Sequence, residues 1–103
     1  MLHMLVARHG PETCPASRPE YREKYLPQFA QLADISKKHG VSIEGGWTNM
    51  PAHLTYILVE APDAQAVCDL AADAQIMNWN WVESLLPVIT MADAAANAQR
   101  RQL

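Results

Sequence analysis

The order in which strand-like and helix-like segments alternate limits this chain to very few folds. Runs rich in β-branched and aromatic residues cover residues 2–8, 41–49, 53–60 and 83–90. Between the first two runs, apolar residues recur every three or four positions from Tyr21 to Ile35, which predicts a helix that ends at Gly40. A second helix is expected over residues 64–74, with Asp63 as its N-cap. The predicted order is strand, helix, strand, strand, helix, strand.

This order defines the split βαβ, or ferredoxin-like, arrangement. It is an α+β fold with an antiparallel βαββαβ sheet and both helices on one face. Pro87 places the fourth strand at a sheet edge, and Pro27 is expected to kink or split the first helix. We assign residues 1–91 to this domain and residues 92–103, which are rich in alanine, to a C-terminal helical tail.

The sheet face that carries no helices would expose apolar residues to water unless another chain packs against it. Two helices protect one face only, and the first strand carries too many apolar residues for its other face to be wet. A chain of 103 residues buries only about 60–65% of its unfolded surface, so self-association would add to a modest core. We therefore expect a homodimer in which two sheets pack face to face.

Charge and hydropathy exclude several classes of partner. The net charge is −3, and no lysine or arginine occurs between His39 and Gln99. Binding to nucleic acid or to an anionic membrane therefore has no electrostatic support. No apolar run approaches the ~20 residues that span a bilayer, and the N-terminus lacks the basic region of a secretory signal. We expect a cytoplasmic protein with no membrane and no nucleic-acid partner.

The tripeptide Arg8-His9-Gly10 follows the first strand and resembles the signature of histidine phosphatases. That resemblance implies a second arginine far downstream to stabilise the charge of the phosphate in the transition state. No arginine lies between Arg22 and Arg100, and Pro11 interrupts the usual continuation. A phosphatase is therefore not expected.

A second resemblance covers most of residues 2–90. The runs GVSIEGGW and LVEAPDAQAV resemble the small dimeric α/β-barrel proteins, and especially their short ferredoxin-like members, which are uncharacterised or nickel-binding. The matching positions are Gly40, Val41, Glu44, Trp47, Glu60, Ala61, Pro62 and Val67. The resemblance implies a dimeric α/β barrel. Because that superfamily holds monooxygenases, isomerases, haem-degrading enzymes and metal binders, it does not select a function.

The leading hypothesis is a small organic molecule bound in the barrel. It assumes that Leu2, Met4 and Val6 meet the helices, so that the alternate residues of the first strand face the barrel interior. His9 is then the candidate catalytic residue, as a general acid–base near neutral pH. The candidate ligand-binding residues are His3, Trp47, His53 and Tyr56, with Trp79 or Trp81 as a further lining residue. The chemistry would be that of an isomerase or a cofactor-free oxygenase, with no cofactor predicted.

The alternative is a divalent-metal binder, similar to the nickel-binding proteins. His3 and His9 share a strand face but lie roughly 20 Å apart, too far to chelate one ion. An antiparallel first and third strand instead brings His9 near His53, with Cys14 or Glu12 as a further ligand from the adjoining loop. The strand register decides whether both histidines share a face. A third reading is a structural dimer with no pocket.

Overall fold

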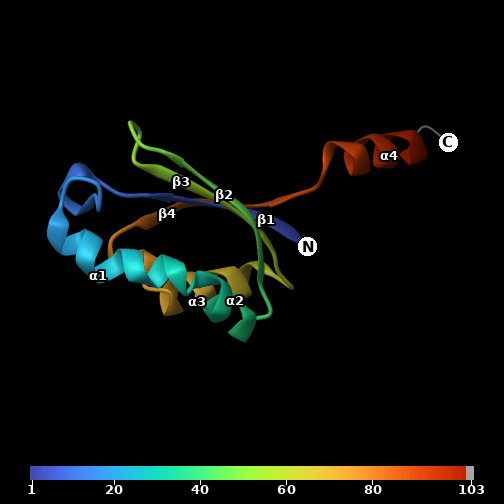
Figure 1. The fold of residues 1–103 in the computed structure, drawn as a ribbon. Coiled ribbons are helices and arrows are strands. Elements are labelled where there is room, and N and C mark those ends of the chain that lie inside the picture. Colours follow the sequence, from blue (N-terminus) through green and yellow to red (C-terminus); the bar gives the residue numbers. More distant parts are fainter. Residues whose placement is uncertain (102–103) are drawn as a thin grey trace.

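The computed structural model describes residues 1–101, which form an α+β fold with one four-stranded antiparallel sheet. Helices α1 to α3 lie together on one side of the sheet, and α4 projects away from it (Figure 1). In chain order the elements are β1 (Leu2–Arg8), the 3-10 turn η1 (Pro11–Thr13), α1 (Pro19–Ala30), α2 (Leu32–Lys38), β2 (Ser42–Asn49), β3 (Leu54–Glu60), α3 (Ala64–Asp73), the 3-10 turn η2 (Ile76–Asn78), β4 (Trp81–Val88) and α4 (Met91–Arg101).

The strands are ordered β2-β3-β1-β4, and every neighbouring pair is antiparallel. This order agrees with the expected βαββαβ sheet, and β4 lies at an edge, as Pro87 predicted. In the register of β1 and β3, Arg8 lies opposite Leu54. His9, which follows β1, therefore lies beside His53, which precedes β3.

Local sequence signals explain most of the element boundaries. Asp63 accepts a hydrogen bond from the Ala66 N–H at 2.8 Å and caps α3, as expected. Gly40 has a φ of 69°, the left-handed conformation that ends a helix cheaply only at glycine. Pro27 lies inside α1, and the helix is interrupted four residues later, at Gln31.

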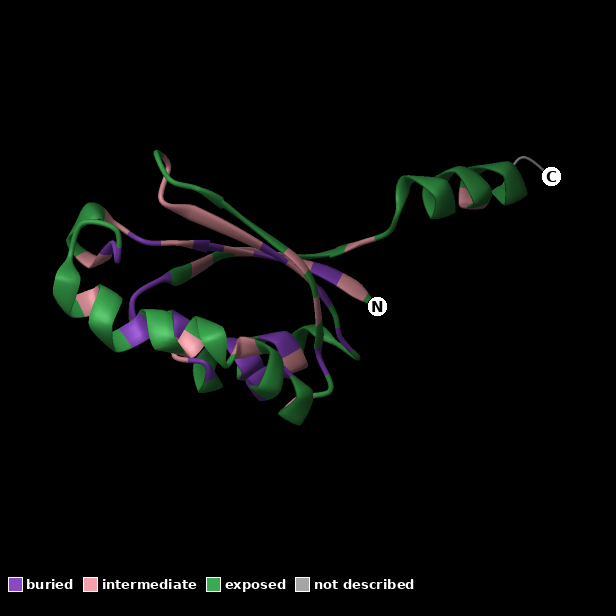
Figure 2. Cartoon of the chain, in the orientation of Figure 1, coloured by how far each residue is buried: buried purple, intermediate pink, exposed green. Residues whose placement is uncertain are grey.

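The core lies between the sheet and helices α2 and α3 (Figure 2). Along β1 the buried residues are His3, Leu5 and Ala7, and they alternate with half-buried ones. Leu5 and Ala7 belong to the same cluster as Val67 and Leu70 of α3. The prediction that Leu2, Met4 and Val6 meet the helices is therefore wrong. The pattern of polar and apolar residues in β1 could not decide which face meets the helices, because a shift of one residue exchanges the two faces of a strand.

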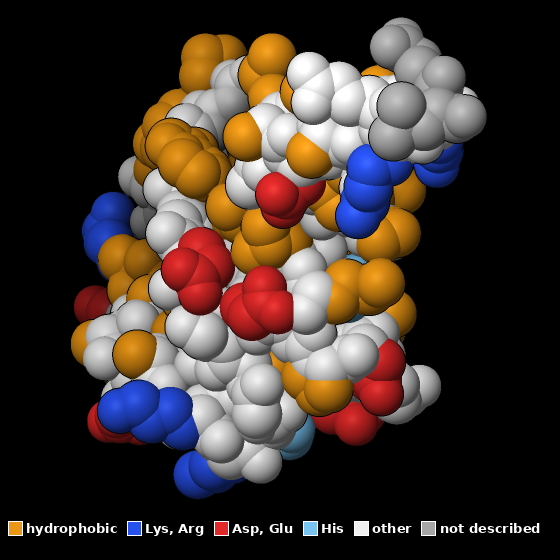
Figure 3. Space-filling model, turned by 90° about the vertical axis from the view of Figure 1, so that its right-hand side faces the viewer, with side chains coloured by type: hydrophobic (Ala, Val, Ile, Leu, Met, Phe, Trp, Pro, Cys, Tyr) orange, Lys and Arg blue, Asp and Glu red, His pale blue; other side chains and the backbone are white. Residues whose placement is uncertain are grey.

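The other face of the sheet is uncovered and largely apolar. Met4 and Val6 of β1 point to this side, because they alternate with the core residues. Leu58 and Leu86 lie opposite Met4, and Tyr56 lies opposite Val6. The surface continues to Trp47, opposite Tyr56, and to Trp81, opposite Arg8. Trp47, Trp81 and Leu86 are each more than half exposed. In Figure 3, hydrophobic side chains gather over the upper part of the molecule, the side to which the bare sheet and α4 belong. We call this surface the open face.

Helix α4 forms most of the expected C-terminal tail. It begins at Met91, all but one of its described residues are exposed, and it lies apart from the other helices (Figure 2). The last two residues of the predicted tail, 102 and 103, lie outside the described part of the chain. Within residues 1–101, none of the helices has the length and the apolar character needed to cross a bilayer.

Candidate functional site

A pocket of about 240 Å³ opens at the end of the sheet where β1 finishes and β3 begins. It lies on the helix-covered side, because Thr55, which lines it, alternates with the open-face residue Tyr56. Its walls come from the loop after β1, from α1, from the β2–β3 connection and from the segment before β4. The lining residues are His9, Cys14, Pro15, Ala16, Arg22, Leu26, Thr48, Met50, His53, Thr55 and Trp79.

His9 and His53 meet at the floor of this pocket. Their main chains are joined by a hydrogen bond from the His9 N–H to the His53 carbonyl, at 3.1 Å. Their rings approach edge to face, and His9 Nε2 lies 3.3 Å from His53 Nδ1. The antiparallel pairing of β1 with β3 produces this contact, and the two side chains share a face.

Asn80 fixes the orientation of the His9 ring. The Asn80 side-chain N–H donates to the Ile76 carbonyl at 3.1 Å, so Asn80 Oδ1 is turned toward His9. Oδ1 can only accept, and His9 Nδ1, 3.3 Å away, must therefore carry the proton. This tautomer leaves an unprotonated lone pair on Nε2, directed at His53. A histidine held in this way by a side-chain oxygen is typical of metal ligands.

Cys14 completes a group of three donor side chains. The turn η1 brings it back over the end of β1, and its side chain is buried. The Sγ atom and the nearest ring nitrogens of His9 and His53 all lie within 4.8 Å of one another. His9 Nε2 and His53 Nδ1 lie 3.3 Å apart in a hydrogen bond, a separation close to that of two nitrogens on one tetrahedral zinc ion. Metal binding would require His53 to give up the proton of this hydrogen bond and the three side chains to turn toward the ion.

His53 adopts a backbone conformation that few side chains tolerate. Its φ is 56°, in the left-handed region, and its N–H donates to the Met50 carbonyl at 3.1 Å. For a residue other than glycine or asparagine this conformation costs of the order of 1 kcal/mol. Among the described residues other than glycine, this conformation occurs at His53, which places a second imidazole beside His9, and at Gln75 outside the pocket.

Trp79 closes the pocket on the helix side. It is buried, and its ring lies 5.2 Å from that of His9 and 5.8 Å from that of Phe29, between ring centroids. The Thr13 hydroxyl donates to the Trp79 carbonyl at 3.1 Å and so ties this segment to the loop that carries Cys14. Trp79 therefore shields the His9 ring from water and fixes one wall of the pocket.

The environment of His9 lowers its pKa below the ordinary value. Burial is the largest cause, because it disfavours the charged imidazolium, and the neighbouring His53 acts in the same direction. The Asn80 hydrogen bond and the Glu12 carboxylate oppose this shift only in part. His9 is therefore held as a neutral imidazole, the form that binds metals or accepts a proton.

The lowered pKa of His9 predicts a pH-dependent stability. As pH falls through the ordinary histidine value of about 6.5, the unfolded chain takes up a proton that the folded chain refuses. Stability is therefore lost from about pH 6.5 downward, until the folded-state pKa is reached. Urea unfolding of metal-free protein between about pH 7.5 and 5.5 should show a steeper loss for the wild type than for His9→Gln. Parallel curves would contradict the expected shift.

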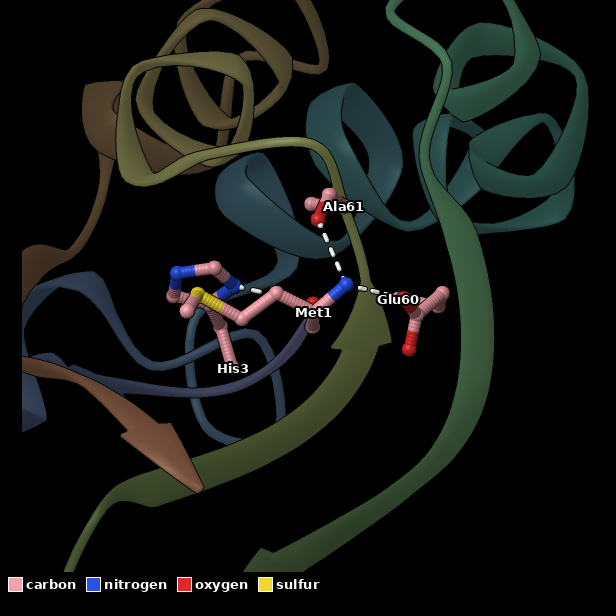
Figure 4. A network of polar contacts seen from close by, with 4 residues as sticks. All are labelled: Met1, His3, Glu60 and Ala61. Carbon is pink, nitrogen blue, oxygen red and sulfur yellow. Dashed lines mark hydrogen bonds and ion pairs between the residues drawn. The ribbon is translucent and has the colours of Figure 1, made fainter. Parts of the chain in front are cut away.

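The other predicted ligand-binding residues lie away from this pocket. His3 is buried on the same strand face as His9 but at the opposite end of β1. There its Nδ1 lies 3.2 Å from the Met1 carbonyl, while the terminal amine of Met1 contacts Glu60 and donates to the Ala61 carbonyl at 3.1 Å (Figure 4). Trp47 and Tyr56 face each other on the open face. Of the predicted site residues, His9 and His53 line the pocket. His3 instead makes a local contact with the Met1 carbonyl.

Asn80 and Arg22 are the site residues that sequence reasoning did not assign, and it left open whether Trp79 or Trp81 lines the pocket. Asn80 and Trp79 lie in the segment QIMNWNW, where no single periodicity stands out. Arg22 reads as an exposed residue of an amphipathic helix. Only the packing of α1 and of the segment before β4 around the loop after β1 brings Arg22 and Trp79 into the pocket lining and Asn80 against His9.

Comparison with protein families assigns the chain to a family whose description names no function. The chain matches the family described as Domain of unknown function (DUF3303) over residues 1–102, and it belongs to that family. Among solved structures it is similar to a structural-genomics protein, YJCS, with a TM-score of 0.49 and 14% sequence identity. That similarity covers 87% of this chain and all of the other. A comparison with curated proteins gives no match.

Proposed function

We propose that this protein binds one divalent transition-metal ion per chain through His9, Cys14 and His53 and presents it to a small molecule in the adjoining pocket. The observation that carries the proposal is the convergence of the three donor atoms within 4.8 Å. Two neutral imidazoles and a thiolate form a ligand set that suits zinc or nickel, and they disfavour magnesium and calcium, which prefer oxygen.

The number of protein ligands supports a working site over a purely structural one. Structural zinc sites have four protein ligands, whereas catalytic sites have three and leave a position for water or substrate. Here the three donors lie in the wall of a pocket whose remaining lining offers no carboxylate or further histidine. The fourth position would therefore face the pocket. The ion would act there as a Lewis acid or lower the pKa of a bound water.

A metal-free reading uses the same geometry. His9 Nε2 is unprotonated and buried beside an apolar cavity, and its pKa is lowered, so it could accept a proton from a bound organic molecule. In this second candidate function the protein would be an isomerase or a cofactor-free oxygenase with His9 as the base. Chelator treatment distinguishes the two, because only the metal-dependent site loses its ligand chemistry when the ion is removed.

We also propose that two copies pack through the open face, as in a dimeric α/β barrel of ferredoxin-like domains. Two charges on this surface neutralise each other within one chain: Arg8 Nε and Nη2 donate to the Glu83 carboxylate at 2.9 and 3.0 Å. Across a twofold axis this pair therefore adds no net like charge to the interface. Its apolar strands would cover those of the first copy at the normal spacing between packed sheets.

Metal titration of chelator-treated protein tests the proposed function. Native mass spectrometry with Zn²⁺ or Ni²⁺ should show one ion per chain, and Mg²⁺ at the same concentration should show none. Substitution with Co²⁺ should produce a thiolate-to-cobalt charge-transfer band that Cys14→Ser removes. If no ion is retained, or if the Co²⁺ spectrum is the same in Cys14→Ser, the metal proposal is wrong and the metal-free base becomes the leading function.

A further inference from the structure

Arg22 gives the pocket a positive wall opposite its apolar lining. It is the one permanently charged side chain among the described residues that line the pocket, and no aspartate or glutamate is among them. Its side chain is exposed and, like the other described lysines and arginines except Arg8, it takes part in no ion pair. What distinguishes Arg22 is its place in the wall of an apolar pocket, where its free guanidinium can pair with an anionic ligand.

The Arg22 guanidinium is held by the protein at one nitrogen, and its other N–H groups remain free to donate hydrogen bonds. Only its Nη1 contacts the protein, with the carbonyls of Pro15 and Ala16 at 3.4 and 3.5 Å. These contacts hold the side chain against the loop that also carries Cys14. The Nε and Nη2 groups have no acceptor among the described residues. That pair of parallel N–H groups can hold a carboxylate through two hydrogen bonds.

The other lining residues indicate the size and the apolar character of the ligand. Leu26, Met50, Pro15 and Trp79 make much of the remaining lining apolar. A strongly hydrated inorganic anion would lose its water against these side chains, whereas an apolar group would gain from burial. The volume of about 240 Å³ lies below the ~300 Å³ where pockets for drug-sized ligands begin, so the ligand is small.

We infer that the pocket binds a small organic carboxylate, with the carboxylate on Arg22, the apolar body against Leu26 and Met50, and the far end at the metal. This inference rests on the proposed function, since the ligand and the ion share one cavity. It also gives the bound ligand an orientation. Its carboxylate would be recognised by α1, and its other end would lie at His9, Cys14 and His53, where any chemistry would occur.

Calorimetric titration with benzoate tests this assignment, with benzamide as its neutral counterpart and inorganic phosphate as an anion without an apolar body. Benzoate should bind the wild type at least tenfold more tightly than either. Arg22→Gln should reduce its affinity at least tenfold, to the level of benzamide. Arg18→Gln is the matched control, because Arg18 is exposed on the same helix start and lies outside the pocket, and it should leave the affinity unchanged.

The titrations are carried out with chelator-treated and with zinc-loaded protein, so that the two proposals fail separately. If the protein binds no zinc but still binds benzoate in an Arg22-dependent way, the metal proposal is wrong and the carboxylate inference stands. Equal binding of benzoate and benzamide, equal effects of the two arginine variants, or phosphate binding as tight as that of benzoate would each overturn the carboxylate inference. The wild-type comparison remains decisive even if Arg22→Gln does not fold.

Discussion

Replacing His53 by glycine is expected to abolish metal binding while leaving the metal-free fold at least as stable. Glycine adopts the φ of 56° freely, so His53→Gly should relieve about 1 kcal/mol of backbone strain. The same change removes one of three ligands, and the affinity for Zn²⁺ should fall at least about 100-fold. Competition with a chromophoric chelator measures the affinity, and urea unfolding of chelator-treated protein measures the stability.

Two further variants show whether this loss reflects coordination. Asn80→Ala keeps all three donors but removes the oxygen that orients His9, so the affinity should fall by about 10- to 100-fold. His39→Asn changes a histidine that pairs with Asp73 outside the pocket, and it should leave the affinity unchanged. Zinc should also raise the melting temperature of the wild type but not of His53→Gly. Unchanged zinc affinity in His53→Gly would contradict the proposed ligand set.

A glutamate at position 6 is expected to convert the proposed dimer into monomers. Val6 lies on the central strand β1, in the middle of the open face, with Tyr56 and Ser84 as its cross-strand neighbours. In a twofold interface the Val6→Glu change would bury two like charges without partners, and the dimer dissociation constant should rise at least about 100-fold. Sedimentation velocity at micromolar concentration measures the change in mass.

The control for this variant places the same charge on the opposite side of the molecule. Ala72 is an exposed residue of α3, so Ala72→Glu should leave the mass unchanged. Circular dichroism of Val6→Glu should stay that of the wild type, because in a single chain Val6 belongs to the uncovered side of the sheet. A wild type that sediments as a monomer, or a Val6→Glu protein that remains a dimer, would contradict the sheet-to-sheet dimer.

Local patterns were sufficient to predict the architecture of this chain. The strand signal in Leu2–Arg8, the Asp63 cap and the Gly40 stop each act within a few residues, and each element boundary appears in the structure where it was expected. The strand order then follows from the rules that join such elements. From that order alone, the meeting of His9 with His53 was also predicted, because antiparallel strands place the end of one beside the start of the next.

The face of the sheet that carries the pocket was decided by the tertiary structure. Both faces of β1 are apolar in sequence, and the burial of Leu5 and Ala7 against α3 made the helix-covered side the one that holds His9. Trp47 and Tyr56, predicted as pocket lining, consequently lie on the open face.

What the sequence by itself determined was the set of elements, their order and the pair of histidines at one end of the sheet. Only the tertiary structure brought Asn80 and Arg22 to that site, from the segment before β4 and from α1, and showed that Cys14 rather than Glu12 joins the two histidines. The physical reason is the range of the interactions. Caps, turns and strand periodicity act between near neighbours, whereas a binding site depends on how distant segments pack, and a single step in strand register changes which side chains meet.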